Sequence, residues 1–166
     1  KNRDDATKNW NVYATILGNN YFELNQPNVT FTGANYFNNT LSTNTVFSVG
    51  SLGSTNGNGN GMIAYCFHSV DGFSKVGRYI SNNSADGPFS YTGFRPAFLL
   101  IKRTQSASAN WLIYDDKRDT YNQMQFALFP NTDGAEYTSN LLHVDFLSNG
   151  FKIRNATYGE TNAPSG

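Results

Sequence analysis

The chain has 166 residues, with 12 basic and 12 acidic side chains and a formal net charge of zero. This balance offers no basic excess for a nucleic acid, and the longest apolar run, residues 96–101, is far below the ~18 residues of a membrane span. Aromatic residues make up 15% of the chain, and Gly, Asn, Ser and Thr are abundant. This composition favours short strands joined by tight turns, so we predict an all-β protein.

Alternation of apolar and polar residues, bounded by turn formers, predicts the strands in chain order. They cover residues 10–15, 21–24, 45–49, 62–70, 74–80, 97–103, 111–115, 125–129, 142–147 and 151–154. Asn149 and Gly150 stand between apolar arms and predict a tight hairpin. We expect residues 96–101 to form a central strand buried on both faces. The single cysteine, Cys66, rules out an internal disulfide and is expected to be a small buried hydrophobe.

An internal repeat organises the chain. Residues 1–10 align without a gap with residues 102–111, and each stretch continues as Asn-Trp-x-x-Tyr. Weaker similarity links residues 45–50 with 144–150 and residues 58–61 with 162–166. We expect Trp10 and Trp111 to fill equivalent core positions.

The repeat predicts two related antiparallel β-sandwich units of a jelly-roll or lectin-like kind. The first covers residues 1–71 and the second residues 72–166. The first unit is expected to be incomplete because it has no leading strand, and the second because it has no closing strand. Either flanking sequence supplies these strands, or another chain does.

Residues with catalytic potential are sparse. His68 and His143 each lie within a predicted strand, the sequence has no Gly-x-Ser-x-Gly elbow, and only three of the acidic residues are Glu. Residues 131–136 resemble a calcium loop only loosely, because they lack its full spacing. We therefore expect no enzyme activity, no cofactor and no metal.

The densest charge cluster is the candidate binding site. Its members, with two nearby tyrosines, are Asp115, Asp116, Arg118, Tyr121 and Tyr137. They are interpreted either as a solvated turn with local salt bridges or as a polar site for a sugar hydroxyl or a neighbouring subunit. The wider set of possible glycan contacts comprises Tyr21, Tyr36, Tyr79, Tyr91, Tyr121, Tyr137 and Tyr158.

A series of short motifs adds a resemblance. The motifs are Gly-Phe at residues 72–73, Gly-x-Tyr at 77–79, Thr-Gly-Phe-x-Pro-Ala at 92–97, Lys-Arg at 102–103, Asn-Trp at 110–111 and Asp-x-x-Arg at 115–118. Together they resemble a tandem domain of unknown function in tail-fibre and other virion structural proteins of marine bacteriophages. The resemblance covers most of residues 45–166 and implies a β-sandwich in a virion setting, without catalytic residues.

The functional hypothesis follows from the repeat, the neutral polar composition and this resemblance. We expect a virion structural protein of a bacteriophage, in a tail fibre, a spike or a surface decoration. Its expected partners are other virion proteins, copies of itself in a homo-oligomer such as a trimer, and a cell-surface glycan. The alternatives are a secreted carbohydrate-binding or adhesin module and a glycan-degrading depolymerase.

Overall fold

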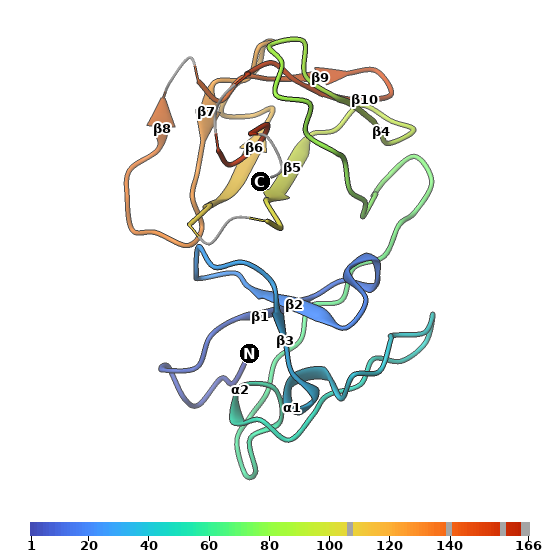
Figure 1. The fold of residues 1–166 in the computed structure, drawn as a ribbon, viewed down its shortest axis with the longest axis vertical. Helices are drawn as coiled ribbons and strands as arrows, with labels where there is room; N and C mark the ends of the chain where they lie inside the picture. The colour runs from blue at the N-terminus through green and yellow to red at the C-terminus, as the bar shows by residue number, and fades with distance from the viewer. Residues whose placement is uncertain (106–107, 139–140, 157–158, 164–166) are drawn as a thin grey trace.

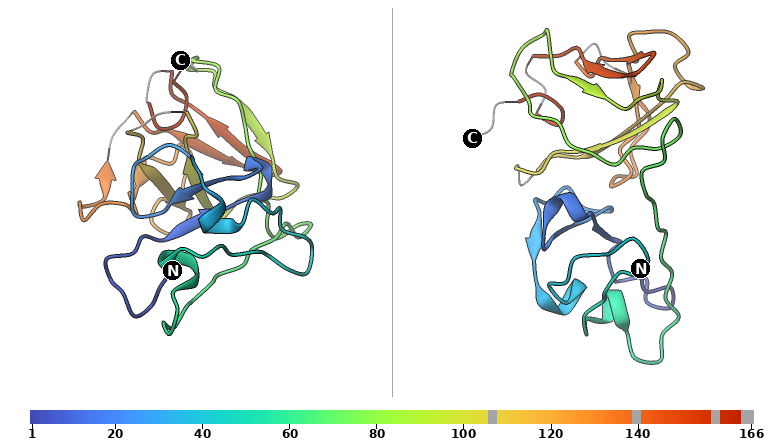
Figure 2. Two further views of the ribbon diagram at one scale, coloured as in Figure 1. Left: turned by 60° about the horizontal axis from the view of Figure 1, so that its bottom comes forward. Right: turned by 90° about the vertical axis from the view of Figure 1, so that its right-hand side faces the viewer.

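The computed structural model describes residues 1–105, 108–138, 141–156 and 159–163. It is rich in strands and poor in helices, and its strands form small antiparallel sheets (Figure 1). The prediction of an all-β protein is therefore confirmed at this level. The N-terminal half lies beside the C-terminal half, and residues 62–80 run along one side from one half to the other (Figure 2).

The N-terminal half has a three-stranded sheet with the order β1-β2-β3. Its elements are β1 (Asn11–Tyr13), η1 (Thr15–Leu17), β2 (Asn20–Glu23), β3 (Phe31–Thr32), α1 (Ala34–Phe37) and α2 (Gly53–Asn56). Aromatic rings pack on this sheet, and the rings of Tyr21 and Tyr36 stack with their centroids 4.1 Å apart. The half is thus held by a small aromatic cluster.

The C-terminal half contains three sheets, ordered β4-β10-β9, β5-β6 and β7-β8. The strands are β4 (Phe89–Tyr91), β5 (Phe98–Lys102), β6 (Trp111–Asp115), β7 (Phe126–Ala127), β8 (Tyr137–Thr138), β9 (Val144–Leu147) and β10 (Gly150–Ile153). The main core of the molecule lies here, and its most deeply buried members are Leu112, Tyr114, Met124, Ala127, Leu142, Val144 and Ile153. Burial of these side chains supplies the main hydrophobic stabilisation of the fold.

The predicted hairpin at Asn149 and Gly150 is confirmed. Leu147 pairs with Gly150, so Ser148 and Asn149 form the tight turn between β9 and β10, and Gly150 is the first residue of β10. Gly150 also permits close packing of β4, because a Cβ built there would lie 2.2 Å from the main-chain oxygen of Ser90. Any larger residue would push β4 away from β10.

Corresponding strands pair in the same register within each half. Val12 pairs with Phe22, and Ile113, the counterpart of Val12 in the sequence repeat, pairs with Leu128. The partner lies ten positions after Val12 but fifteen after Ile113, so the second connection is five residues longer. Beyond this insertion the agreement continues: Tyr21 pairs with Phe31 in β2–β3, as Ala127 pairs with Tyr137 in β7–β8.

An asparagine side chain closes the base of the N-terminal hairpin. Asn25 Oδ1 accepts the main-chain N–H of Trp10 at 2.9 Å, and Asn25 Nδ2 donates to Asn9 Oδ1 at 2.9 Å. The adjoining turn is closed by the N–H of Gln26, which donates to the oxygen of Glu23 at 3.2 Å. We call this arrangement an asparagine clasp.

The C-terminal half has the same clasp. Asn131 Oδ1 accepts the N–H of Trp111 at 2.8 Å, and Asn131 Nδ2 donates to Asn110 Oδ1 at 2.8 Å. The adjoining turn is again closed, here by the N–H of Thr132 and the oxygen of Phe129 at 3.0 Å. Each clasp satisfies partly buried polar groups that would otherwise cost free energy.

Some sequence predictions are wrong. Residues 45–49, 62–70 and 74–80 form no regular strand: Val70 and Ser74 meet in a tight turn, and elsewhere the stretch 62–80 is extended chain apart from one bridge at Met62. Alternation alone cannot create a strand where a neighbouring strand is lacking.

Burial was also mispredicted at three places. Cys66 is exposed, because the segment that carries it lies on the surface. The apolar run 96–101 gives a strand at the edge of its sheet, with Phe98 and Leu100 exposed at 59% and 42%. Trp111 is buried, but Trp10 is only half-buried and stacks on Tyr65.

Candidate interaction site

The predicted charge cluster forms a hydrogen-bonded turn after β6. Asp115 Oδ1 accepts the main-chain N–H groups of Lys117 and Arg118 at 3.0 and 2.9 Å, and Asp115 Oδ2 accepts Arg118 Nε at 2.5 Å. The Arg118 guanidinium also donates to Glu136 Oε1 at 2.7 Å and to the oxygen of Ile113. Burial opposes ionisation of Asp115, but the hydrogen bonds from Arg118 and Lys117 outweigh it and lower the pKa of the carboxyl group.

The other predicted site residues lie around this turn. Asp116 forms a salt bridge with Arg95 at 3.2 Å. Tyr121 lies in the loop between β6 and β7, which we call the outer loop, with 81% of its surface exposed. Tyr137 is half-buried, and its ring packs against Phe129 with centroids 5.4 Å apart.

The structure therefore brings Asp115 and Arg118 together with Glu136, and leaves Tyr121 apart from them. Sequence reasoning missed Arg95 and Glu136, which are distant in the chain from the turn they contact. The close ion pairs make Asp115 and Arg118 part of the loop's scaffold, whereas Tyr121 remains free to meet a ligand.

The seven tyrosines proposed as glycan contacts divide by exposure. Tyr91 and Tyr121 are exposed, Tyr36, Tyr79 and Tyr137 are half-buried, and Tyr21 is buried. Tyr158 lies outside the described residues. Burial raises the pKa of the Tyr79 hydroxyl. This hydroxyl donates a hydrogen bond to the main-chain oxygen of Thr161 at 2.8 Å, so Tyr79 has a structural role in linking two distant parts of the chain.

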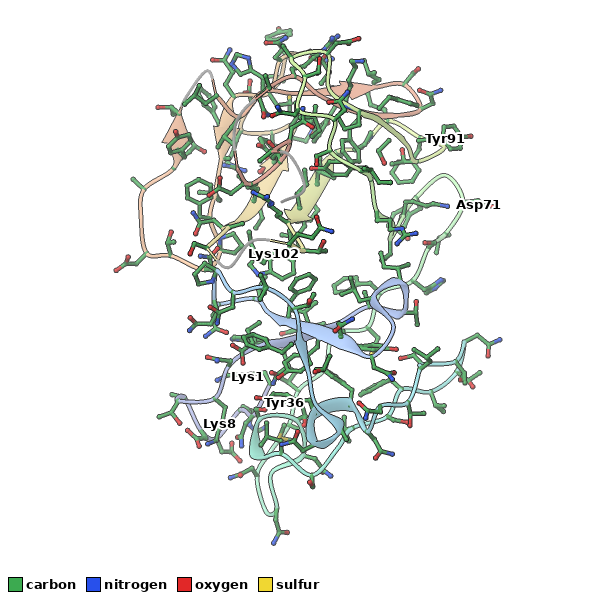
Figure 3. The ribbon with its side chains drawn as sticks, in the orientation of Figure 1. Lys1, Lys8, Tyr36, Asp71, Tyr91 and Lys102 are labelled. Carbon is green, nitrogen blue, oxygen red and sulfur yellow. The ribbon has the colours of Figure 1, made fainter. Side chains whose placement is uncertain are left out.

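A small polar cavity of about 220 Å³ opens in the N-terminal half. It is lined by Thr7, Lys8, Asn9, Glu23, Tyr36, Leu52, Gly53 and Ser54. Ser54 is 5% exposed, and its hydroxyl has no hydrogen-bond partner within the described part of the chain. The cavity was not predicted, because it joins four segments of the chain that no local motif connects. Lys8 and Tyr36, which lie in the same half, are labelled in Figure 3.

Residues 62–80, which we call the connecting segment, carry the most exposed apolar side chains. Tyr65, Phe67, Phe73 and Ile80 are exposed at 66%, 84%, 80% and 81%. Large apolar surfaces on soluble proteins mark sites of association, because leaving them in water costs about 25 cal/mol per Å². The connecting segment is therefore a candidate interaction surface.

The junction between the halves is polar and aromatic. Lys102 Nζ donates to the oxygen of Pro27 at 2.9 Å and to that of Ala109 at 2.5 Å, and lies 5.9 Å from the centre of the Phe22 ring. Figure 3 shows Lys102 between the two halves. Burial lowers the pKa of the Lys102 ammonium group to about 8.

Metal sites and membrane-spanning helices would each bear on function. Within the described ranges, no three or more His, Cys, Asp or Glu side chains gather where a metal ion could bind. Among the same residues, no helix has the length and apolar character needed to cross a bilayer.

These features define a class of protein: a small antiparallel β protein with paired hairpins, an ion-paired outer loop and a large exposed apolar segment. The chain belongs to the family described as Domain of unknown function (DUF7483), which matches residues 1–166. Comparisons with curated proteins and with solved structures give no significant match.

Proposed function

We propose that this chain is a structural component of a bacteriophage virion, in a tail fibre, a spike or a surface decoration. It works as part of an oligomer, such as a trimer, with contacts to other virion proteins, and it performs no chemical reaction. The observation that carries the proposal is the exposed connecting segment, with Phe67 and Phe73 each at least 80% exposed. In an assembly these side chains are covered by a neighbour, which offsets the cost of their hydration. The virion setting comes from the resemblance of the motifs at residues 72–118.

We further propose that the chain is built from two related β-sandwich units, residues 1–71 and 72–166. The matched registers and the two asparagine clasps support this duplication. A further matched contact comes from the first residues of the repeat: Asn2 Nδ2 donates to the oxygen of Gly53 at 2.9 Å, and its counterpart Arg103 donates to the oxygen of Gly159 at 2.8 Å.

The test of a virion role is to locate the chain in purified particles. Mass spectrometry should detect it there, and immunogold labelling should place it on a fibre, a spike or the capsid surface. Exposed Cys66 provides a second measurement, because a maleimide should label it in the isolated chain and label it more slowly in the particle. Purified particles without the chain would refute the proposal.

A secreted carbohydrate-binding or adhesin module is the second candidate. The polar cavity with its unpartnered Ser54 hydroxyl favours it, since such groups suit sugar hydroxyls. The isolated chain should then bind specific glycans on an array, and Ser54→Val should abolish binding while Ser51→Ala, at an exposed serine, should not. A fall in polysaccharide viscosity on incubation would instead identify a depolymerase.

A further inference from the structure

The residues around the polar cavity have counterparts in the C-terminal half. Beyond the five-residue insertion, residues 53–56 (Gly-Ser-Thr-Asn) align with residues 159–162 (Gly-Glu-Thr-Asn), so Glu160 is the counterpart of Ser54. The matched hydrogen bonds to Gly53 and Gly159, described above, agree with this alignment. The two halves therefore differ at this place by a substitution within the repeat.

In the C-terminal half a side chain closes this place. Asn110 Nδ2 donates to Glu160 Oε1 at 3.3 Å. In the N-terminal half the counterparts, Asn9 and Ser54, both line the cavity. The shorter Ser54 side chain leaves the Asn9 Nδ2 donor without a partner in the described part of the chain, and the buried Ser54 hydroxyl has none there either. The cavity thus lies between two residues whose counterparts contact each other.

A second exchange brings a carboxylate into the cavity wall. Glu23 stands where the C-terminal half has Phe129, and it is 9% exposed. Its carboxylate forms no hydrogen bond or ion pair with any described residue, so a bound molecule or water has to supply the donors that such a buried group needs. Lys8, on the same wall, carries the opposite charge, and its Nζ lies 3.6 Å from Asp5 Oδ2. One positive and one negative group on the wall favour a neutral ligand.

The wall offers the groups that a sugar ring requires. Neighbouring hydroxyl groups of a sugar can donate to the two oxygens of Glu23, and such charge-assisted bonds are strong. Asn9 Nδ2 and the Ser54 hydroxyl can donate to sugar oxygens, and Leu52 and Tyr36 add apolar surface. The volume of about 220 Å³ is smaller than the roughly 300–1,000 Å³ of sites for drug-sized molecules, so a single sugar ring is the unit that fits.

We propose that this cavity is a binding site for one neutral hexose unit of a glycan, with Glu23 as the acceptor of a pair of neighbouring hydroxyl groups. Asn9 and Ser54 hold the opposite side of the ring. The C-terminal half has no equivalent site, because Phe129 cannot accept hydrogen bonds through its side chain and Glu160 occupies Asn110. This inference rests on the second candidate function, glycan binding, and names its site and its ligand.

Heteronuclear NMR of the isotope-labelled full chain is the direct test, with the methyl glycosides of mannose, galactose and glucose as probes. At least one of them should shift the amide signals of residues 7–9, 23 and 52–54 in a saturable manner. The counterparts at residues 108–110, 129 and 159–160 are the internal control, and their signals should stay in place. Absence of saturable shifts with every probe, or equal shifts in both halves, would overturn the inference.

Two variants test the roles of the wall residues. Ser54→Glu recreates the closed arrangement of the C-terminal half and should abolish binding, whereas Ser51→Glu, which adds the same charge at an exposed serine, should not. Glu23→Gln keeps the size of the side chain and should weaken binding about tenfold, because it removes the charge that strengthens two hydrogen bonds. Hexoside binding that survives Ser54→Glu would place the ligand elsewhere and refute the site.

Charged sugars test the choice of a neutral ligand. Tighter binding of glucosamine or of glucuronic acid than of every methyl hexoside would overturn this choice. A glycan array separates the inference from the function on which it rests. Array binding that Ser54→Glu leaves unchanged would uphold glycan binding and refute the cavity as its site, and hexoside binding in the cavity by a chain that binds no glycan on the array would do the reverse.

Discussion

The indole nitrogen of Trp111 donates a hydrogen bond to the main-chain oxygen of Glu23 at 3.0 Å, and this bond is buried at the junction of the two halves. The Phe22 ring packs edge-on against the same indole, with centroids 5.5 Å apart. One side chain thus provides both the polar and the aromatic contact between the N-terminal sheet and β6. The two halves are therefore expected to unfold together.

Replacing this indole tests the junction. Trp111→Phe keeps most of the ring but removes the N–H donor, so we expect the free energy of unfolding to fall by about 1–2 kcal/mol in urea titrations. Trp10→Phe, at the half-buried counterpart, should cost less. An equal loss for both variants would show that the bond to Glu23 contributes nothing measurable.

The asparagine clasps give a second prediction. Asn131→Ala removes two hydrogen bonds at the base of a hairpin, and we expect it to lower the free energy of unfolding by about 2 kcal/mol. Asn25→Ala should behave in the same way. A double-mutant cycle with Asn110→Ala should show coupling to Asn131, whereas strict additivity would contradict the clasp.

How much of the fold the sequence predicts depends on how far apart in the chain the interacting residues lie. The hairpin at Asn149 and Gly150 and the Trp111–Asp115 strand follow from neighbouring residues, and both are confirmed. The clasps could not be found in this way, because Asn25 and Asn131 are displaced by the five-residue insertion. Once the two halves are aligned by their strand pairing, Asn25 and Asn131 correspond to each other. Each of them lies on the hairpin arm opposite an Asn-Trp pair.

The connecting segment shows the opposite case. Its residues alternate as a strand should, and residues 62–70 and 74–80 were predicted as strands, yet no sheet accepts them here. A β-strand forms only where a neighbouring strand supplies partners for its backbone hydrogen bonds, and the local sequence does not show whether such a neighbour is present. For the candidate site, local charge density found Asp115 and Arg118, but their partners Arg95 and Glu136 depend on tertiary packing.

Acid should weaken the turn after β6. The pKa of Asp115 is lowered in the folded chain, so its ion pair stabilises the fold above the unfolded pKa of about 3.9, and this contribution is lost as the pH falls through the lower folded value. Asp115→Asn should therefore cost about 1 kcal/mol at pH 7, and this cost should shrink as the pH falls below the ordinary range of a carboxyl group. Asp71→Asn, at an exposed residue, is the control; a difference independent of pH would contradict this assignment.

Alkaline pH should act on the junction through Lys102. Its pKa is lowered to about 8 in the folded chain, against about 10.4 when unfolded, so the unfolded state binds more protons between these values. The free energy of unfolding should consequently rise with pH across this window. Lys102→Met should flatten that rise, and Lys75→Met, at an exposed position, should preserve it. Parallel pH profiles for wild type and Lys102→Met would rule the effect out.

The five extra residues between β6 and β7 leave the pairing of Ile113 with Leu128 in the same register as that of Val12 with Phe22. The length of the β6–β7 loop can therefore change without changing how the hairpin strands pair. A foreign epitope inserted after exposed Thr120 should be carried outward without disturbing either hairpin, which makes this loop a natural attachment point for tags and imaging probes.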